Sequence, residues 1–395
     1  MSTAVGSLAD LGYILEETYG VVPPSPAFKK VRRVKTTLDL TKDTYASQEI
    51  RTDRQTADMR HGVRHVAGDI QGELSVGTYD DFMQALLGGT WTTGVSASQA
   101  DFTSIVCSGG GKTFTAAGGS FITKGFKVGD VVQFTGLAST GNNAKNFTIV
   151  GLTALVMTVA ETVVTDATPD TTCSVAVVGK KVLMGNTYRS FVIERQYTDI
   201  SQYQAFVGCR MDKLALSLPP TGIVTSTWSV IGKDMNALTS STLSTGSLST
   251  VSTHSPLAAV SGVLRENATT LATVTGLTLN ITNNLGGKPV IGANTIPDQL
   301  WGNACQITGQ ITALFQDATL LNKFVSETES NLEFRLDDPN GTDFLHFYIP
   351  RLKYTSGSIG DADPQGLPLT MNFTALAPTT TTNIDASSIV VQRSN

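Results

Sequence analysis

Residues 68–87, GDIQGELSVGTYDDFMQALL, predict a strand that leads directly into a short helix. In the first half of this stretch apolar or small residues alternate with polar ones, which is the two-residue period of a β-strand. The predicted faces are Ile70, Gly72, Leu74 and Val76 on one side and Gln71, Glu73 and Ser75 on the other. An alternation of this kind is typical of a strand with one face in a core and one face in water.

The second half of the same stretch predicts the helix. Thr78 stands where an N-cap residue is expected, and Asp81 follows at the spacing of a capping box. Phe82, Met83 and Leu86 form the apolar stripe, and Gly88 or Gly89 is expected to end the helix. A similar helix is predicted for residues 316–327, with a cap at Asp317 and a stripe made by Leu320, Leu321 and Phe324.

The strand and helix pattern occurs twice. Residues 305–324, CQITGQITALFQDATLLNKF, match residues 68–87 when Ile70 is set against Ile307 and Gly72 against Gly309. Segments 34–43 and 274–284 match upstream, and segments 190–218 and 333–359, followed by 222–232 and 366–376, match downstream. Because the order of the elements repeats as well, we interpret the chain as a duplicated β unit. A single large sandwich is the competing interpretation.

The repeat divides the chain into segments. Between the predicted helix and the next strand, the first half has a glycine-rich, nearly uncharged insertion that its counterpart lacks. Within the insertion, residues 120–137 predict two strands joined by a turn, and we expect a small β-barrel domain. The expected segments are an N-terminal arm 1–27, a first unit 28–91 with 186–235, an insertion 92–185, a Ser/Thr-rich linker 236–257, a second unit 258–378 and a C-terminal tail 379–395.

The composition favours a protein that covers its surface with other copies of itself. Charged residues make up only 15 % of the 395 residues, hydrophobic residues make up 41 %, and the net charge is −5. No run of about 18 apolar residues is present, so no membrane-spanning segment is predicted. The start of the chain lacks the pattern of a secretory signal peptide. Cysteines are expected as buried thiols, although pairing of Cys107 with Cys173 is left open.

Motifs for enzyme chemistry are incomplete. SGGGKTF (108–114) lacks the first glycine of a phosphate loop and predicts a turn. His61 and His65 have metal-ligand spacing only on a helix, and no glutamate follows His61. DDPNGTD (337–343) lacks the glutamate of a calcium loop, and the basic run 28–35 lacks the aromatic residues of a nucleic-acid patch. We therefore expect no catalytic residues, no metal and no cofactor.

Several long stretches resemble a family of major tail tube proteins of long-tailed bacteriophages. They are SQEIRTDRQTADMRHGVRHVAGDIQGELSVGTYDDFMQALLGG (47–89), SFVIERQYTDISQYQAFVGCRMDKLALSL (190–218), GNACQITGQITALFQDATLLNKF (302–324) and YIPRLKYTSGS (348–358) followed by GLPLTMNFTAL (366–376). The resemblance implies two tandem β-sandwich or partial-barrel units, each with one helix. It further implies rings that stack into a tube conducting DNA from the virion tail to the host, assembled in the bacterial cytoplasm. The insertion would then lie on the tube exterior.

The resemblance also implies roles for particular residues. The candidate residues of a loop between subunits or rings are Arg51, Asp53, Arg54, Asp58, Arg60, His61, Arg64 and His65. The candidate lumen-facing residues are Gln71, Glu73, Ser75, Thr308, Gln310 and Thr312. Further partners would be the tape measure, tail terminator and distal tail proteins, while DNA would pass without specific binding. With two units per chain, a trimeric ring of pseudo-sixfold symmetry is expected. The alternative is another non-enzymatic virion protein, for capsid decoration or host attachment.

Overall fold

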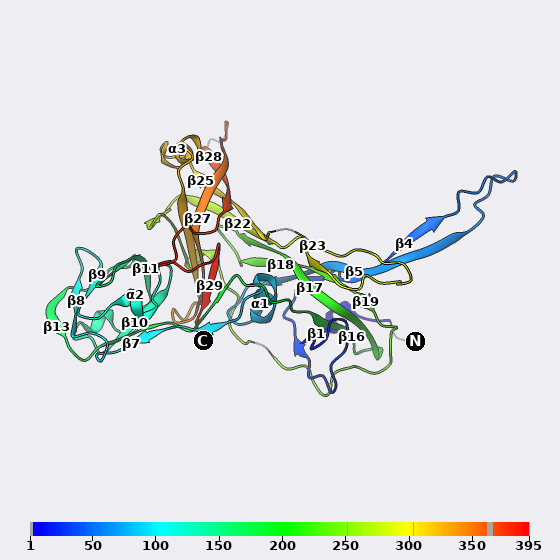
Figure 1. Ribbon diagram of the computed structural model, residues 1–395, viewed down its shortest axis with the longest axis horizontal. Coiled ribbons are helices and arrows are strands. Elements are labelled where there is room, and N and C mark those ends of the chain that lie inside the picture. The colour runs from blue at the N-terminus through cyan, green and yellow to red at the C-terminus, as the bar shows by residue number, and fades with distance from the viewer. Residues whose placement is uncertain (1–2, 251, 303, 362–365, 395) are drawn as a thin grey trace.

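The computed structural model describes residues 3–250, 252–302, 304–361 and 366–394. Within them the chain is mainly β, with three short α-helices. Segments of alternating polarity form antiparallel strands, as their period predicts. Figure 1 shows the inserted segment at one side of the molecule, the strands of the second half above, and the strands of the first half at the other side. The hairpin of β4, Asp39–Ala46, and β5, Met59–Glu73, projects far beyond them (Figure 1).

Four strands of the first half lie side by side in the order β4–β5–β18–β17, all antiparallel. Their bounds are Asp39–Ala46 for β4, Met59–Glu73 for β5, Thr225–Gly232 for β18 and Gln202–Leu218 for β17. The short strand β3, Lys35–Thr36, pairs with β5 just before β4 does. We call this arrangement, with its helix and outer strands, the first unit.

The second half repeats this order as β22–β25–β28–β27, again antiparallel, and forms the second unit. The bounds are Val274–Thr282 for β22, Gln306–Leu314 for β25, Pro368–Ala375 for β28 and Phe344–Ile359 for β27. Each unit has an irregularity at the corresponding place, at Asp212 in β17 and at Thr355 in β27. The two irregularities therefore fix which residues of the units correspond.

The correspondence corrects the register of the sequence repeat. Aligning the irregularities pairs Trp228 with Met371, and hence Ile70 with Ile311. The prediction that Ile70 corresponds to Ile307 is wrong by four residues. Gly309 corresponds to Gly68, and at either position a Cβ would lie 2.5 Å from backbone atoms of the neighbouring strand. This close approach of two strands explains why both units have glycine there.

An outer layer covers one face of these strands. The first halves of the long strands β17 and β27 pair with β16, Phe191–Tyr197, and β26, Ser330–Asp337. These in turn pair with β1, Ala9–Leu15, and β20, Gly262–Glu266, so the first unit begins inside the segment expected to be an N-terminal arm. Shorter strands of this layer are β2 Lys29–Lys30, β19 Asp234–Met235 and β21 Thr269–Thr270. Buried aromatic and aliphatic side chains fill the space between the layers.

The two units share one continuous sheet because β17 pairs with β22. The ladder runs from Lys213 opposite Thr282 to Leu218 opposite Leu277. Asn283 and Leu285 extend it, since their N–H groups donate to the carbonyl and the carboxylate of Asp212. We call this ladder the internal joint.

Each unit has one helix at the expected place. Helix α1, Asp80–Leu87, ends at Gly88, whose φ is 64°, as predicted. The predicted cap is wrong, because Tyr79 is the N-cap residue and the Thr78 hydroxyl bonds to Ser75 at 2.5 Å. Helix α3, Thr319–Val325, has Ala318 rather than the predicted Asp317 as its N-cap residue, although the Asp317 carboxylate accepts the N–H of Thr319 at 2.8 Å.

The inserted segment forms its own eight-stranded sheet in the order β13-β8-β9-β12-β11-β10-β14-β7. The bounds are β7 Ser96–Ala97, β8 Ser104–Ser108, β9 Thr113–Ala117, β10 Val131–Thr135, β11 Phe147–Leu152, β12 Val156–Val159, β13 Asp166–Asp170 and β14 Ser174–Val177. Residues 92–185 are all described and show no closed barrel, since β13 and β7 do not pair. Helix α2, Phe121–Lys124, replaces the first of the two strands predicted for residues 120–137. Cys107 and Cys173 are buried free thiols.

The insertion is anchored to the second unit. Its stems, β6 Thr92–Thr93 and β15 Lys180–Leu183, pair with each other, and β15 pairs with the C-terminal strand β29, Val390–Arg393. Strand β29 pairs with β27, so residues expected to form a C-terminal tail belong to the sheet. The Gln392 side chain accepts the N–H of Val131 and donates to the Val131 carbonyl, both at 2.8 Å. The insertion is therefore a docked domain rather than a freely hanging one.

The described residues of the Ser/Thr-rich segment 236–257, expected to be a linker, are docked on the first unit. The buried Glu194 carboxylate accepts the N–H of Leu243 at 2.7 Å and the hydroxyl of Thr242 at 2.6 Å. Backbone bonds join Ser249 to Phe28 and to Lys30. The segment follows the surface of the first unit before it enters the second unit.

Candidate functional site

The uncovered face of the shared sheet is polar along its whole width. Side chains that point away from the core are threonine, serine, asparagine, glutamine or charged residues in almost every strand. We call this surface the open face. Five of the six candidate lumen residues lie on it, namely Gln71, Glu73, Thr308, Gln310 and Thr312.

The sixth candidate, Ser75, does not belong to the open face. Strand β5 ends at Glu73, so the alternation that placed Ser75 beside Glu73 no longer applies. Ser75 is 3 % exposed, and its hydroxyl bonds to Thr78 and accepts from Arg32. Its role is to stabilise the turn between β5 and α1.

Hydrogen bonds between side chains cross the strands of the open face. In the second unit, Gln310 donates to Asn372 at 3.0 Å, and Asn372 donates to Ser356 at 2.7 Å. In the first unit, Ser229 donates to Asp69 at 2.7 Å. Asp69, Asn280 and Ser356 also belong to this face, although they were not among the predicted residues. Asn280 alternates with buried neighbours and could have been found in this way, whereas the irregularity at Thr355 interrupts the alternation before Ser356.

The two units contribute different charges to the open face. The first unit places Asp69 and Glu73 on it, together with Lys35 and Lys213. The corresponding strands of the second unit carry mainly amides and hydroxyls, including Asn280 and Gln310, with Lys353 as a cation. A polyanion near this face would meet carboxylates and neutral dipoles, with isolated lysines rather than a basic patch to bind its phosphates.

Two edges of the shared sheet are unpaired among the described residues. At one end, Asp39–Ala46 of β4 pairs with β5 only. At the other end, residues 353–359 of β27 pair with β28 only. Strand edges with free N–H and C=O groups are templates for pairing with another chain.

Helix α3 is uncovered next to the β27 edge, in contrast to α1. The apolar stripe of α3 corresponds to the apolar stripe of α1. In α1 these side chains are at most 3 % exposed, namely Phe82, Met83, Leu86 and Leu87. None of the α3 residues is buried, and Val325 is 71 % exposed. Ile359 of β27 is 38 % exposed, whereas Leu216, which corresponds to it, is 2 % exposed. This difference leaves an apolar strip beside a free edge.

The predicted contact loop is a long hairpin that projects from the first unit (Figure 1). We call residues 42–64 the arm. Residues 42–61 are exposed except for half-buried Ser47, and Arg51 forms an ion pair with Asp53 at 2.6 Å. Arg54 and Asp58 also lie in the tip segment between β4 and β5.

The other candidates of this group lie in a strand rather than in a loop. Arg60, His61, Arg64 and His65 belong to β5. A spacing of four residues in a strand separates His61 from His65 by roughly 13 Å, too far for one metal ion. Arg64 binds Asp234 at 2.6 Å, and its N–H donates to Asn294 of the second unit at 2.9 Å.

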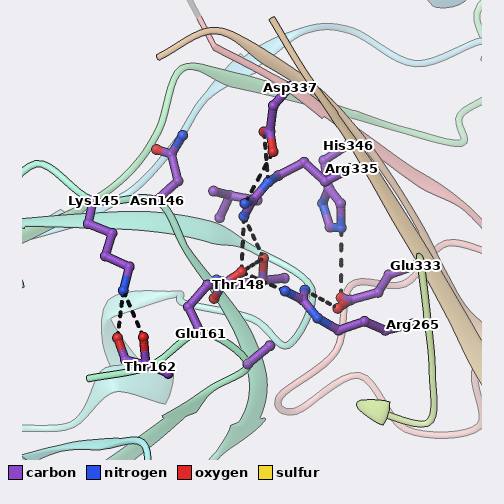
Figure 2. Close-up of polar contacts among 12 residues, drawn as sticks. Lys145, Asn146, Thr148, Glu161, Thr162, Arg265, Glu333, Arg335, Asp337 and His346 are labelled. Atoms are coloured by element: carbon purple, nitrogen blue, oxygen red, sulfur yellow. Dashed lines mark hydrogen bonds and ion pairs between the residues drawn. The ribbon is translucent and has the colours of Figure 1, made fainter. Parts of the chain in front are cut away.

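A buried cluster of charges joins the insertion to the second unit (Figure 2). The Glu161 carboxylate of the insertion lies 2.8 Å from Arg265 and 3.1 Å from Arg335, and it accepts both the N–H and the hydroxyl of Thr148. Arg265 also binds Glu333 at 2.7 Å. The side chains of Glu161, Arg265 and Arg335 are between 7 % and 12 % exposed. Each charge therefore depends on its partners rather than on water.

The pKa shifts in the cluster favour the ionised state. Burial alone would lower the pKa of Arg265, but the carboxylates of Glu161 and Glu333 raise it overall. Burial would raise the pKa of Glu333, yet His346, whose Nε2 lies 3.7 Å from the carboxylate, and Arg265, which donates a hydrogen bond to it, lower the pKa below its ordinary value of 4.5. The cluster is thus a structural anchor with matched charges.

Within the part of the chain that the structure describes, no group of three or more His, Cys, Asp or Glu residues could hold a metal ion. No helix there has the length and apolar character needed to cross a bilayer. The surfaces described above are the open face, the two free edges, the apolar strip on α3 and the arm.

These surfaces define the class of the molecule as a structural β protein suited to edge-to-edge association. A family model described as phage tail tube protein matches residues 6–375. The chain belongs to the phage tail tube protein family, whose members self-assemble into a tube. It is therefore a structural component of a virion tail. This match favours the tail tube over capsid decoration or host attachment. The comparison with individual curated proteins gives no match.

Removing one charge from the buried cluster should destabilise the protein. We expect Glu161→Gln to lower the free energy of unfolding by about 3 kcal/mol, because Arg265 and Arg335 lose a buried partner. Urea unfolding followed by fluorescence measures the change. The control is Glu327→Gln, since Glu327 is 84 % exposed and lies 3.9 Å from Lys353. A surface pair of this kind contributes at most about 1 kcal/mol. Equal effects of both variants would contradict the anchoring role.

The lowered pKa of Glu333 predicts acid sensitivity. A carboxylate whose pKa is depressed on folding stabilises the folded state above its unfolded pKa and loses this contribution as pH falls through the folded value. The loss should therefore begin near pH 4.5 and continue below it. The test compares the free energies of unfolding of the wild type and of Glu333→Gln, measured at intervals between about pH 6 and pH 3. A parallel decline in both proteins would show that Glu333 does not contribute.

Proposed function

We propose that three copies of the chain close into a ring of six corresponding units, and that stacked rings form the tail tube. The internal joint is the observation that carries this proposal. The internal joint pairs β17 of the first unit with β22 of the second unit. The corresponding strands, β27 of the second unit and β4 of the first unit, each leave an edge unpaired at opposite ends of the shared sheet. A contact that repeats around an axis closes into a ring when the rotation fits.

The internal joint supplies the register of the contact between chains. Ala215 lies opposite Asn280 in the internal joint. By the correspondence of the units, Ser358 takes the place of Ala215 and Asp39 takes the place of Asn280. Ser358 of one copy should therefore lie opposite Asp39 of the next. The apolar strip on α3 supports this pairing, because Asn283, which follows β22 and donates to the Leu86 carbonyl of α1, would have its counterpart in the next copy.

The open face is the proposed wall of the channel. It would pass DNA during ejection without binding it specifically, since carboxylates, amides and hydroxyls give phosphates few cationic partners. The arm is the proposed contact between rings. The tape measure protein within the tube, and the tail terminator and distal tail proteins at its ends, are the proposed further partners. Assembly is proposed to take place in the host cytoplasm.

Engineered disulfides test the ring. We expect Asp39→Cys combined with Ser358→Cys to cross-link chains in assembled protein, because directly opposed strand residues have the Cα separation of a disulfide. Ala215→Cys with Asn280→Cys should instead form a bond within one chain. Asp39→Cys with Ser356→Cys is the mismatched control, with the cysteines displaced along the strand by two residues.

The products distinguish the possible rings. Non-reducing electrophoresis should show covalent species up to a closed trimer, and native mass spectrometry should show three chains per ring. Six chains per ring would refute the trimer. Equal cross-linking by the matched and mismatched pairs would refute the proposed register.

Lysines on the open face test the channel. We expect Thr308→Lys with Gln310→Lys to slow genome ejection, because each added cation can bind a phosphate and release a counterion. The effect should weaken at high salt. The control is Thr168→Lys with Thr171→Lys, two exposed positions on the insertion that add the same charge. Ejection kinetics of phage carrying either pair give the measurement, and equal rates would place the open face outside the channel.

A further inference from the structure

We propose that Ile50, at the tip of the arm, inserts into an apolar cleft on a chain of the next ring. This inference rests on the proposed stacking of rings and identifies the two surfaces that would meet. It commits to one occupant of the cleft, a second copy of this chain.

The cleft lies where the two units meet, at one end of the internal joint. It has a volume of about 330 Å³, and none of its lining residues is charged. The first unit contributes Leu218, Pro219 and Pro220 from the end of β17, and the second unit contributes Leu264, Leu271 and Phe334 among others. An uncharged apolar cleft of this kind can accept a branched aliphatic side chain.

The arm and the cleft lie at opposite ends of the strands. In β22, Val274, Gly276 and Leu277 line the cleft, while the opposite end at Thr282 leads into the hairpin of β23, Leu285–Gly286, and β24, Leu300–Trp301. That hairpin corresponds to the arm, because Thr282 corresponds to Thr41 and Gln306 to His65. Strands that pair around a ring run between its two rims. The arm therefore projects from one rim, and the cleft opens toward the other.

The tip of the arm presents one strongly exposed apolar side chain. Ile50 is 98 % exposed and lies between polar residues. The corresponding residue of the second hairpin, Ile291, is fully exposed as well. That hairpin is held inside its own chain, since Asn294 accepts the N–H of Arg64 and Asp298 binds Arg210 at 3.0 Å. The arm is the hairpin that extends freely, so Ile50 is the side chain available to another ring.

The number of clefts matches the number of arms. At the proposed joint between chains, Asp10 corresponds to Val263 of the cleft, and Arg195 corresponds to Phe334. At the joint between chains, the surface that corresponds to the cleft would therefore be polar rather than apolar. Each chain thus has one apolar cleft and one extended arm, and a ring of three chains would offer three of each to its neighbours.

Two variants test the proposal, one at the tip of the arm and one in the cleft. Ile50→Asp places a charge at the tip, and Ala272→Trp fills the cleft at an exposed lining residue. Each should leave rings of three chains intact and shorten tubes at least about tenfold, because loss of one buried isoleucine weakens each contact about tenfold to a hundredfold. Ile291→Asp is the matched control and should leave tube length unchanged. Native mass spectrometry measures the rings, and electron microscopy measures the tubes.

Cross-linking identifies the contact directly. Ile50→Cys with Ala272→Cys should link chains of adjacent rings in assembled tubes, while Ile291→Cys with Ala272→Cys should not. Normal tubes from Ile50→Asp, or shortened tubes from Ile291→Asp, would overturn the assignment while trimeric rings still stood. Absence of rings in the wild-type protein would instead refute the proposed function, and the inference with it.

Discussion

The ladder between β17 and β22 is the interaction on which the rest of the structure depends. Backbone hydrogen bonds from Lys213 to Leu218 turn two separate sheets into one, and they bring the buried side chains of both units into a single core. The ladder also sets the order of the strands, because it places the four strands of the first unit on one side and the four strands of the second unit on the other. The open face, the free edges and the cleft are all defined by this one pairing.

The two units have the same strand order but do not have the same surroundings. The stems of the insertion pack beside α1, and Asn283, which follows β22 of the second unit, donates to the carbonyl of Leu86. The stripe of α3 has no such cover in the described chain, so a similar sequence pattern is buried in one unit and half-exposed in the other. Burial therefore depends on the position of a unit within the chain as much as on its sequence.

The insertion illustrates how a segment can belong to one unit in the chain and to another in space. It leaves the first unit after α1, yet its buried charges meet Arg265 and Arg335 of the second unit. Ion pairs buried in this way contribute little net stability, but they strongly disfavour any arrangement that separates the partners. They fix the insertion across the two units together with β29, which pairs with both β15 and β27.

The sequence by itself indicated the main strands of both units, helices α1 and α3 and the general position of the insertion, because alternation and glycines act locally. It missed helix α2 and the terminal strands β1 and β29. It also indicated the polar face, since Gln71, Thr308 and Gln310 alternate with buried neighbours. Only the tertiary structure decided the register of the repeat, because a period of two is satisfied equally well after a shift of four residues. Ser75 was misplaced because alternation ends where the strand ends. Pairs such as Glu161 with Arg265, separated by 104 residues, arise when distant segments fold together, and no local pattern encodes that meeting.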